Sequence, residues 1–192
     1  IAQTPYVMMQ WHGPDYRNDS AATVAADVFS SILGLNSSKW QQALIDKGLA
    51  TFASVGYQTA KHVGPVNIFA VPNPKKLKEF HAEVLNQIAK MGDTDYFTDE
   101  QLATAKEILL RNKIRRVEKP SSLSMNLTFW WCSTSLNYFT AYDEEMQKVT
   151  REDIIRYTKK YIVDKPYIAG IIINEEMSKQ IKPEEFFKNP KS

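Results

Sequence analysis

The sequence predicts an α+β fold: a single domain with a mostly antiparallel sheet and helices layered on one of its faces. The predicted elements run in the order strand, two helices, hairpin, several helices and strand, and such segregation is typical of this class. The length of 192 residues suits one hydrophobic core, for which 9 Phe, 9 Tyr and 4 Trp supply apolar surface. Neither an internal repeat nor a shift in composition marks a domain boundary. We therefore assign residues 1–192 to one domain.

The N-terminal part predicts a strand followed by two helices. Residues 6–11 are rich in Val, Met and aromatic residues, which indicates a strand buried on both faces. Apolar residues then recur at helical spacing over 24–35. Ser38 and Gln41 have the spacing of a capping box, and Gly48 stands where a glycine ends a helix. A short second helix is therefore expected after Ser38.

A hairpin and an amphipathic helix come next. Residues 51–58 alternate in polarity and 66–71 are continuously apolar, so the two segments are expected to pair. Asn73 is predicted to cap the following helix, with Pro74 at its first position. One stripe of that helix is apolar: Leu77, Phe80, Val84, Ile88 and Met91.

The C-terminal half predicts more helices and a last strand. Thr98 and Gln101 form a capping-box pair that opens a long helix ending near Val117. Its apolar residues fall in two adjacent stripes, so we expect it to be buried over a wide arc.

An aromatic segment, 123–142, follows this long helix. Thr150 and Asp153 then form another capping box, which starts a helix that ends near Tyr161. Residues 167–173 are expected to form the last strand.

Charge and cysteine content exclude several classes of function. With 24 Lys and Arg against 22 Asp and Glu, the net charge of +2 creates no field that would attract nucleic acid. No stretch approaches the roughly 18 apolar residues that a membrane span needs. Cys132 is the only cysteine, which excludes an internal disulfide and a multi-cysteine zinc site. No signal peptide opens the sequence, and because Ile1 stands where an initiator Met is absent, we expect a processed product or an excised piece.

The search for catalytic groups is negative. The sequence contains no G-x-S-x-G, P-loop or G-x-G-x-x-G motif. His12, His62 and His81 are far apart, and none has a metal-binding partner at helical spacing. We interpret His81 as a surface or boundary residue, His12 as a strand-end residue and Cys132 as a buried, inert thiol. The prediction is that this chain has no catalytic residue and binds no metal.

The aromatic run Phe129, Trp130 and Trp131 is the most unusual local feature. Core packing is the favoured interpretation. The alternative is an apolar wall that grips a peptide or another partner, which makes these three residues the candidates for substrate binding. Consecutive aromatic residues cannot all face one way on a helix. The basic residues of 111–119 are interpreted as a solvated helix face, with a phosphate-binding patch as the alternative.

A resemblance emerges from four stretches in the same order along the chain. Residues 37–50 contain Ser-Ser-Lys-Trp and Leu-Ile-Asp-Lys-Gly-Leu-Ala. They resemble the Ser-Ser-Arg-Leu and Leu-Arg-Glu-Lys-Gly-Leu-Ala-Tyr run of the non-zinc domains of insulinase/pitrilysin zinc metallopeptidases. Residues 6–14, 98–106 and 149–154 also resemble segments of that family. The resemblance spans about residues 5–175.

The resemblance implies that zinc binding and catalysis belong to a different domain of the same peptidase. In such peptidases a companion domain carries the inverted zinc motif H-x-x-E-H, which this sequence lacks, so zinc is expected in the companion and not in this chain. Some non-zinc domains add an Arg and a Tyr that hold substrate. Those two positions are occupied here by Ile45 and Thr51, whose side chains cannot replace that chemistry. The favoured explanation is a domain type that never carries the pair; the alternative is its loss.

The resulting hypothesis is a non-catalytic domain of a zinc-dependent metalloendopeptidase. It would pack against a zinc-bearing domain, in the same polypeptide or in a partner subunit, and help to enclose a peptide substrate. The chain alone is expected to be inactive. One alternative is a catalytically dead scaffold subunit of a larger assembly, and another is a free-standing peptide-binding module. The resemblance slightly favours the periplasm or cell envelope and leaves the compartment open.

Overall fold

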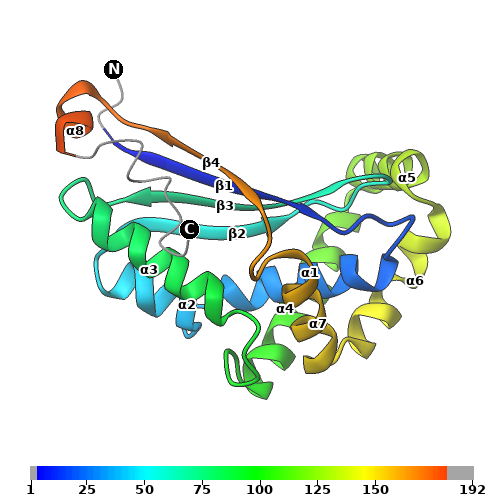
Figure 1. Ribbon diagram of the computed structural model, residues 1–192. Helices are drawn as coiled ribbons and strands as arrows, with labels where there is room; N and C mark the ends of the chain where they lie inside the picture. Colours follow the sequence, from blue (N-terminus) through cyan, green and yellow to red (C-terminus); the bar gives the residue numbers. More distant parts are fainter. Residues whose placement is uncertain (1–3, 181–192) are drawn as a thin grey trace.

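A computed structural model describes residues 4–180, except for the side chains of Arg116 and Gln180. Helices cover one face of a four-stranded sheet and leave the other face open (Figure 1). The strand order is β2-β3-β1-β4, and every pairing is antiparallel. The predicted α+β fold with one layer of helices is thereby confirmed. The strands are β1 (Tyr6–Gly13), β2 (Ala50–Tyr57), β3 (Gly64–Pro72) and β4 (Tyr167–Ile172).

The long helix after Thr98 and the helix after Thr150 begin and end close to their predicted limits. Helices α5 and α6, which contain the aromatic segment 123–142, and α8 in the polar C-terminal part were not predicted. A short π-helical segment, η1, continues α2. The helical elements are α1 (Ser20–Leu33), α2 (Lys39–Gln41), η1 (Gln42–Asp46), α3 (Leu77–Lys90), α4 (Asp99–Val117), α5 (Pro120–Ser133), α6 (Leu136–Lys148), α7 (Arg151–Tyr161) and α8 (Glu175–Gln180).

Strand β1 alternates between the two faces of the sheet. Val7 and Met9 are buried against the helices, whereas Tyr6 and Met8 are 39% and 48% exposed on the open face. The prediction that this strand is buried on both faces was wrong, because helices cover only one face and the side chains of a strand point to both. The continuous apolar run therefore leaves an apolar, uncovered surface on the sheet.

Helix α1 is the centre of the core. Val28, Phe29 and Ile32 are fully buried. Phe29 contacts the rings of Tyr96 and Tyr157, from the loop before α4 and from α7. Asp19 caps the helix by accepting a hydrogen bond from the amide of Ala22. One continuous cluster of buried residues thus joins the sheet to the helices.

The capping predictions are confirmed at the two later helices. Complete capping boxes join Thr98 to Gln101 and Thr150 to Asp153. At α2, Ser38 accepts a hydrogen bond from the amide of Gln41 as expected. The side chain of Gln41 does not return the bond and instead donates to two backbone carbonyls, those of Leu33 and Ala53.

The predicted start of α3 was wrong. The helix begins at Leu77, and Lys76 occupies the cap position without a side-chain bond. Asn73 is used differently: its Oδ1 accepts from the backbone amide of Lys75, and its own backbone amide donates to the carbonyl of Leu49. This residue therefore anchors the end of β3 to the start of β2. The predicted apolar stripe of α3 is buried as expected.

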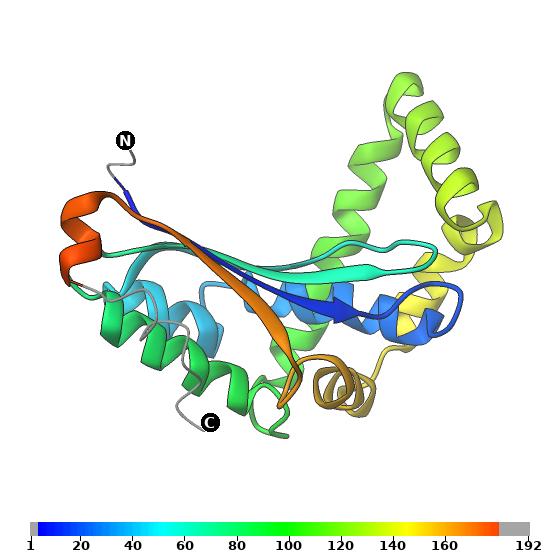
Figure 2. The same ribbon diagram turned by 45° about the horizontal axis from the view of Figure 1, so that its top comes forward.

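Helix α4 is less buried than predicted. Ala105 is fully buried against α1, but Ile114 is 53% exposed and the predicted wide arc of burial is wrong. The reason is visible in Figure 2, where the second half of α4 leaves the body and returns through α5. We call this projecting pair, residues 111–133, the arm. Among the described residues, no helix is both long enough and apolar enough to cross a membrane.

Candidate functional site

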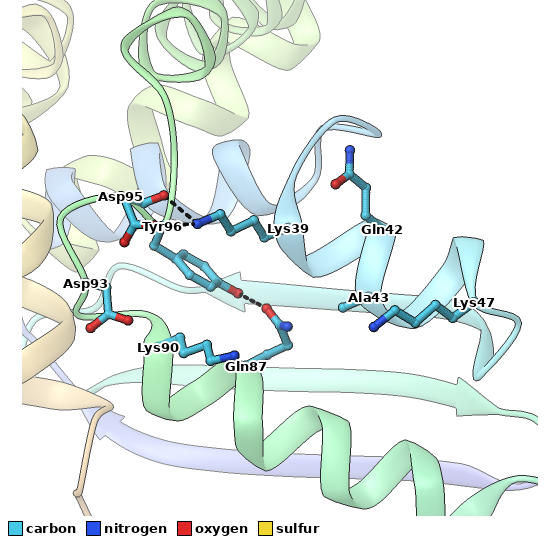
Figure 3. Close-up of a pocket in the computed structure, with 9 residues that line it drawn as sticks. All are labelled: Lys39, Gln42, Ala43, Lys47, Gln87, Lys90, Asp93, Asp95 and Tyr96. Carbon is cyan, nitrogen blue, oxygen red and sulfur yellow. Dashed lines mark hydrogen bonds and ion pairs between the residues drawn. The ribbon is translucent and has the colours of Figure 1, made fainter.

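Residues 37–50, one of the four stretches that carry the resemblance, border an open cavity of about 400 Å³ between η1 and α3 (Figure 3). One wall comes from α2 and η1, the opposite wall from α3, and the loop after α3 closes one end. The lining residues are Lys39, Gln42, Ala43, Lys47, Gln87, Lys90, Asp93, Asp95 and Tyr96.

Trp40 and Gly48 hold the α2–η1 wall in place. Trp40 is fully buried, and its Nε1 donates to the carbonyl of Ala53 at 3.1 Å. Gly48 has φ of 64°, a left-handed conformation that favours glycine and ends the helical segment. A π-helical turn lies between them, and such turns are frequent at functional sites.

The loop after α3 is tied to this wall. Nζ of Lys39 donates to Oδ2 of Asp95 at 3.0 Å and to the same residue's carbonyl at 2.7 Å. That hydrogen bond lowers the pKa of the Asp95 carboxyl. At the base of the cavity, the hydroxyl of Tyr96 donates to Oε1 of Gln87 at 2.8 Å, and burial raises the pKa of this phenol. Tyr96 is therefore neutral at physiological pH.

The other lining groups are donors on long side chains. Lys47 lies 3.8 Å from Glu83, too far for a strong ion pair, and Lys90 comes from the last turn of α3. Ammonium and amide groups of this kind can bind a carboxylate or a peptide carbonyl. The described lining offers no nucleophile with an adjacent base. The cavity is thus built for binding polar groups.

Of the two positions of the family's Arg and Tyr pair, one lies in η1 and the other at the start of β2. Ile45, in η1, packs partly buried against the core. Thr51 is exposed and is the extra residue of a bulge, because Ala50 pairs with Pro72 and Phe52 with Val71. Its hydroxyl donates to the carbonyl of Val71 at 3.3 Å. Both side chains satisfy local packing or hydrogen bonding, and neither offers a charged donor.

The histidines and the cysteine lie apart. His12 is exposed near the end of β1, and His62 is exposed in the β2–β3 connection. His81 is partly buried on α3, and burial lowers its pKa. Cys132 is exposed, so its interpretation as a buried thiol was wrong: it lies on the arm, outside the core. Among residues 4–180, no three or more His, Cys, Asp or Glu side chains form a group that could hold a metal ion.

The aromatic cluster divides between core and surface. Trp130 packs partly buried on the core and contacts Tyr138, which is buried. Phe129 and Trp131 are 45% and 70% exposed on the arm. Core packing therefore explains Trp130 and does not explain its two neighbours. Their exposure depends on the direction in which α4 leaves the body and α5 returns to it, which no local pattern in the sequence encodes. Whether they bind substrate stays a prediction.

Comparison with known proteins decides the family. The sequence model of the peptidase M16 inactive domain matches residues 1–109, more than half of the chain. The chain belongs to the peptidase M16 inactive domain family. The resemblance to the non-zinc domains of insulinase/pitrilysin metallopeptidases is thereby confirmed. No curated protein matches this inactive domain in sequence.

Solved structures share the fold of this inactive domain. The inactive peptidase domain of a putative zinc protease from Bordetella parapertussis has a TM-score of 0.80 at 19% identity, covering 91% of this chain and 92% of that one. A protease from Helicobacter pylori has a TM-score of 0.74 at 21% identity, with 90% of this chain and 42% of that chain covered. A chain of Complex III2 from Candida albicans has a TM-score of 0.70 at 13% identity, over 88% and 43%. The inactive domain thus spans less than half of the Helicobacter chain.

Proposed function

We propose that this inactive domain is a non-catalytic part of a zinc-dependent metalloendopeptidase. It packs against a companion domain that carries H-x-x-E-H, and together the two help to enclose a chamber for the peptide substrate. The observation that carries the proposal is the match to the peptidase M16 inactive domain. The Helicobacter protease supports it, because more than half of that chain lies outside the shared domain and leaves room for a companion. Zinc would be bound by the companion.

In this proposal the cavity beside η1 contributes binding groups. Lys47 and Lys90 can bind carbonyl or carboxylate groups of an extended peptide, while Tyr96 stays neutral and donates to Gln87. The sheet offers a further surface at β4, an edge strand without a charged or proline residue. Ile45 and Thr51 supply no group that could stabilise a developing oxyanion.

The test compares this chain with its H-x-x-E-H companion domain, alone and combined, on a quenched fluorescent peptide. We expect no cleavage and no stoichiometric zinc in this chain alone. The combined sample should cleave the peptide, and a chelator should stop it. Chelator-sensitive cleavage by the 192-residue chain alone would contradict the proposal.

The match to a chain of Complex III2 favours a second candidate, a scaffold subunit without peptidase activity. The same assay distinguishes the two. A stable complex that lacks cleavage at every ratio of the two proteins, although the zinc motif of the companion is loaded, would favour the scaffold. A free-standing peptide-binding module would bind peptide without any companion.

A further inference from the structure

Helix α5 contributes almost nothing to the hydrophobic core. None of its described side chains is buried, although it contains Leu, Met, Phe and two Trp residues. Met125 is 76% exposed and Trp131 is 70% exposed. Monomeric proteins rarely leave apolar surface of this kind uncovered unless another molecule binds there. The arm is therefore a candidate interaction surface.

Helix α5 also differs from the rest of the molecule in charge, including the basic residues of 111–119 on the other helix of the arm. No Asp, Glu, Lys, Arg or His occurs from Pro120 to Tyr142, in a chain with 24% charged residues. Depletion of charge combined with Trp, Phe and Met is typical of the buried centre of a protein–protein interface. The open sheet face also carries apolar residues, among them Tyr6, Phe52 and Phe69, whose rings lie together, but it includes polar residues such as Gln10 and Asn67.

The exposed apolar residues lie on two flanks of α5. At 100° per residue, Leu127 and Trp131 fall on one flank, and Met125 and Phe129 fall on the opposite one. The face of α5 that contains Trp130 is directed towards the body, because Trp130 packs on the core. A flat partner could cover only one flank. A groove that receives the helix can cover both.

The arm is a poor shape for insertion into a membrane. Its far end is the turn between α4 and α5 (Figure 2), where Glu118 and Lys119 are charged. Trp131 lies in the last turn of α5, where the chain returns to the body and continues into α6. A bilayer could reach Trp131 only after the charged turn had entered it, at a large cost in desolvation. The uncharged surface therefore favours a protein partner.

We propose that α5 is the docking element for the zinc-bearing companion domain and inserts into an apolar, uncharged groove on that domain. This inference rests on the proposed function and adds the surface by which the two domains join. The comparisons favour the companion as the binding partner of α5. The shared fold occurs as a separate domain in the Bordetella structure and as 42% of the longer Helicobacter chain. Helix α5 carries no charged residue, and such a surface favours a partner site that is itself uncharged.

Cys132 provides a reporter for this contact. It is the only cysteine, it is exposed, and it lies on α5 next to Trp131. The rate of maleimide labelling of Cys132 is measured with increasing amounts of the H-x-x-E-H domain. At a companion concentration about ten times the dissociation constant only about one tenth of the chain is free, so labelling should slow about tenfold. A Met8→Cys, Cys132→Ser variant places the reporter on the open sheet face and should change less than about twofold.

Substitutions test which surface carries the affinity. Met125→Ser combined with Trp131→Ser should weaken binding of the companion at least about tenfold, since exposed aromatic anchors dominate interfaces. The control Phe52→Ser removes an aromatic residue that is 50% exposed on the sheet face and should leave binding within about threefold. Circular dichroism checks that each variant is folded.

The outcomes separate this inference from the proposed function. A stable complex in which Cys132 labels as fast as in the free chain overturns docking through α5 and leaves the proposed function standing. Protection of Cys132 by vesicles of phosphatidylglycerol, or by the chain itself at high concentration, also overturns it. Failure of the two domains to associate at all overturns the proposed function, and the docking inference with it.

Discussion

At the scale of single residues, Arg151 connects α7 to the loop before α4. Its guanidinium donates to the carbonyls of Thr94 and Phe97, both at 2.6 Å, and pairs with Asp99. The same group lies 4.5 Å from the centre of the Phe97 ring. Only a planar group with several donors makes these contacts together.

Arg151→Lys should therefore lower the free energy of unfolding by about 2 kcal/mol, because one ammonium cannot replace the forked contacts. Urea unfolding at pH 7 measures the change. Arg156→Lys is the matched control: its pair with Asp153 is on the same helix and its side chain is 65% exposed, so a change below about 0.5 kcal/mol is expected. If both variants lost the same free energy of unfolding, the several contacts of the Arg151 guanidinium would not stabilise the protein more than a surface ion pair does.

Residues such as Arg151 mark the limit of sequence analysis. Thr150 was predicted as a cap because its partner Asp153 is three positions away. The partners of Arg151 lie more than fifty positions away and depend on how α7 packs. The exposure of Trp131 and Cys132 was unpredictable for the same reason. Local hydrogen bonds are encoded in spacing, whereas long-range contacts are encoded in the complete fold.

At the scale of elements, Asp19 joins the start of α1 to the end of α7. It caps α1 and accepts hydrogen bonds from Nζ of Lys160 at 2.6 Å and from the hydroxyl of Tyr161 at 2.8 Å. Burial alone would raise the pKa of the Asp19 carboxyl, but these hydrogen bonds outweigh it and the pKa is lowered. The ionised form of Asp19 is thus more stable, relative to the protonated form, in the folded protein than in the unfolded chain.

This lowered pKa predicts a pH-dependent stability. The contribution of Asp19 is complete above the unfolded pKa of about 4 and is lost as the pH falls through the lower folded pKa. Asp19→Asn keeps a capping side chain but loses the charge, so it should unfold about 1 kcal/mol more easily than the wild type at pH 7. The difference should shrink at pH 3.

Urea unfolding of both proteins at pH 7 and pH 3 measures this difference. Asp95→Asn is the control, because that carboxylate is 83% exposed in its pair with Lys39 and should contribute little at either pH. A difference between wild type and Asp19→Asn that grows at pH 3 would contradict the assigned direction.

The elements also differ in how well the sequence predicts them. The stripe of α3 and the limits of α4 follow from periodicity and capping, and both are confirmed. The burial of β1 and α4 was wrong, because periodicity identifies an apolar face without showing what covers it. Only the arrangement of layers decides that question: helices cover one face of the sheet, and half of α4 leaves the body (Figure 2).

At the scale of the whole molecule, a well-packed body supports a loosely attached arm. Val28, Phe29 and Ile32 of α1 are fully buried under the sheet, whereas α5 buries no described side chain. The free energy needed to open an element locally depends on the apolar contacts that opening breaks. The two helices should therefore open with very different free energies, although both belong to one domain.

Hydrogen exchange measured by mass spectrometry on the chain without companion tests this. Amides of α5 should exchange at least about 100-fold faster than those of α1, which corresponds to an opening free energy lower by about 3 kcal/mol. Helix α6, which buries Tyr138 and Met146, is the internal control and should exchange at an intermediate rate. Equal, slow exchange in α1 and α5 would mean that the arm opens only when the whole domain unfolds. The faster rate would instead describe a helix whose stabilising contacts are supplied from outside this chain.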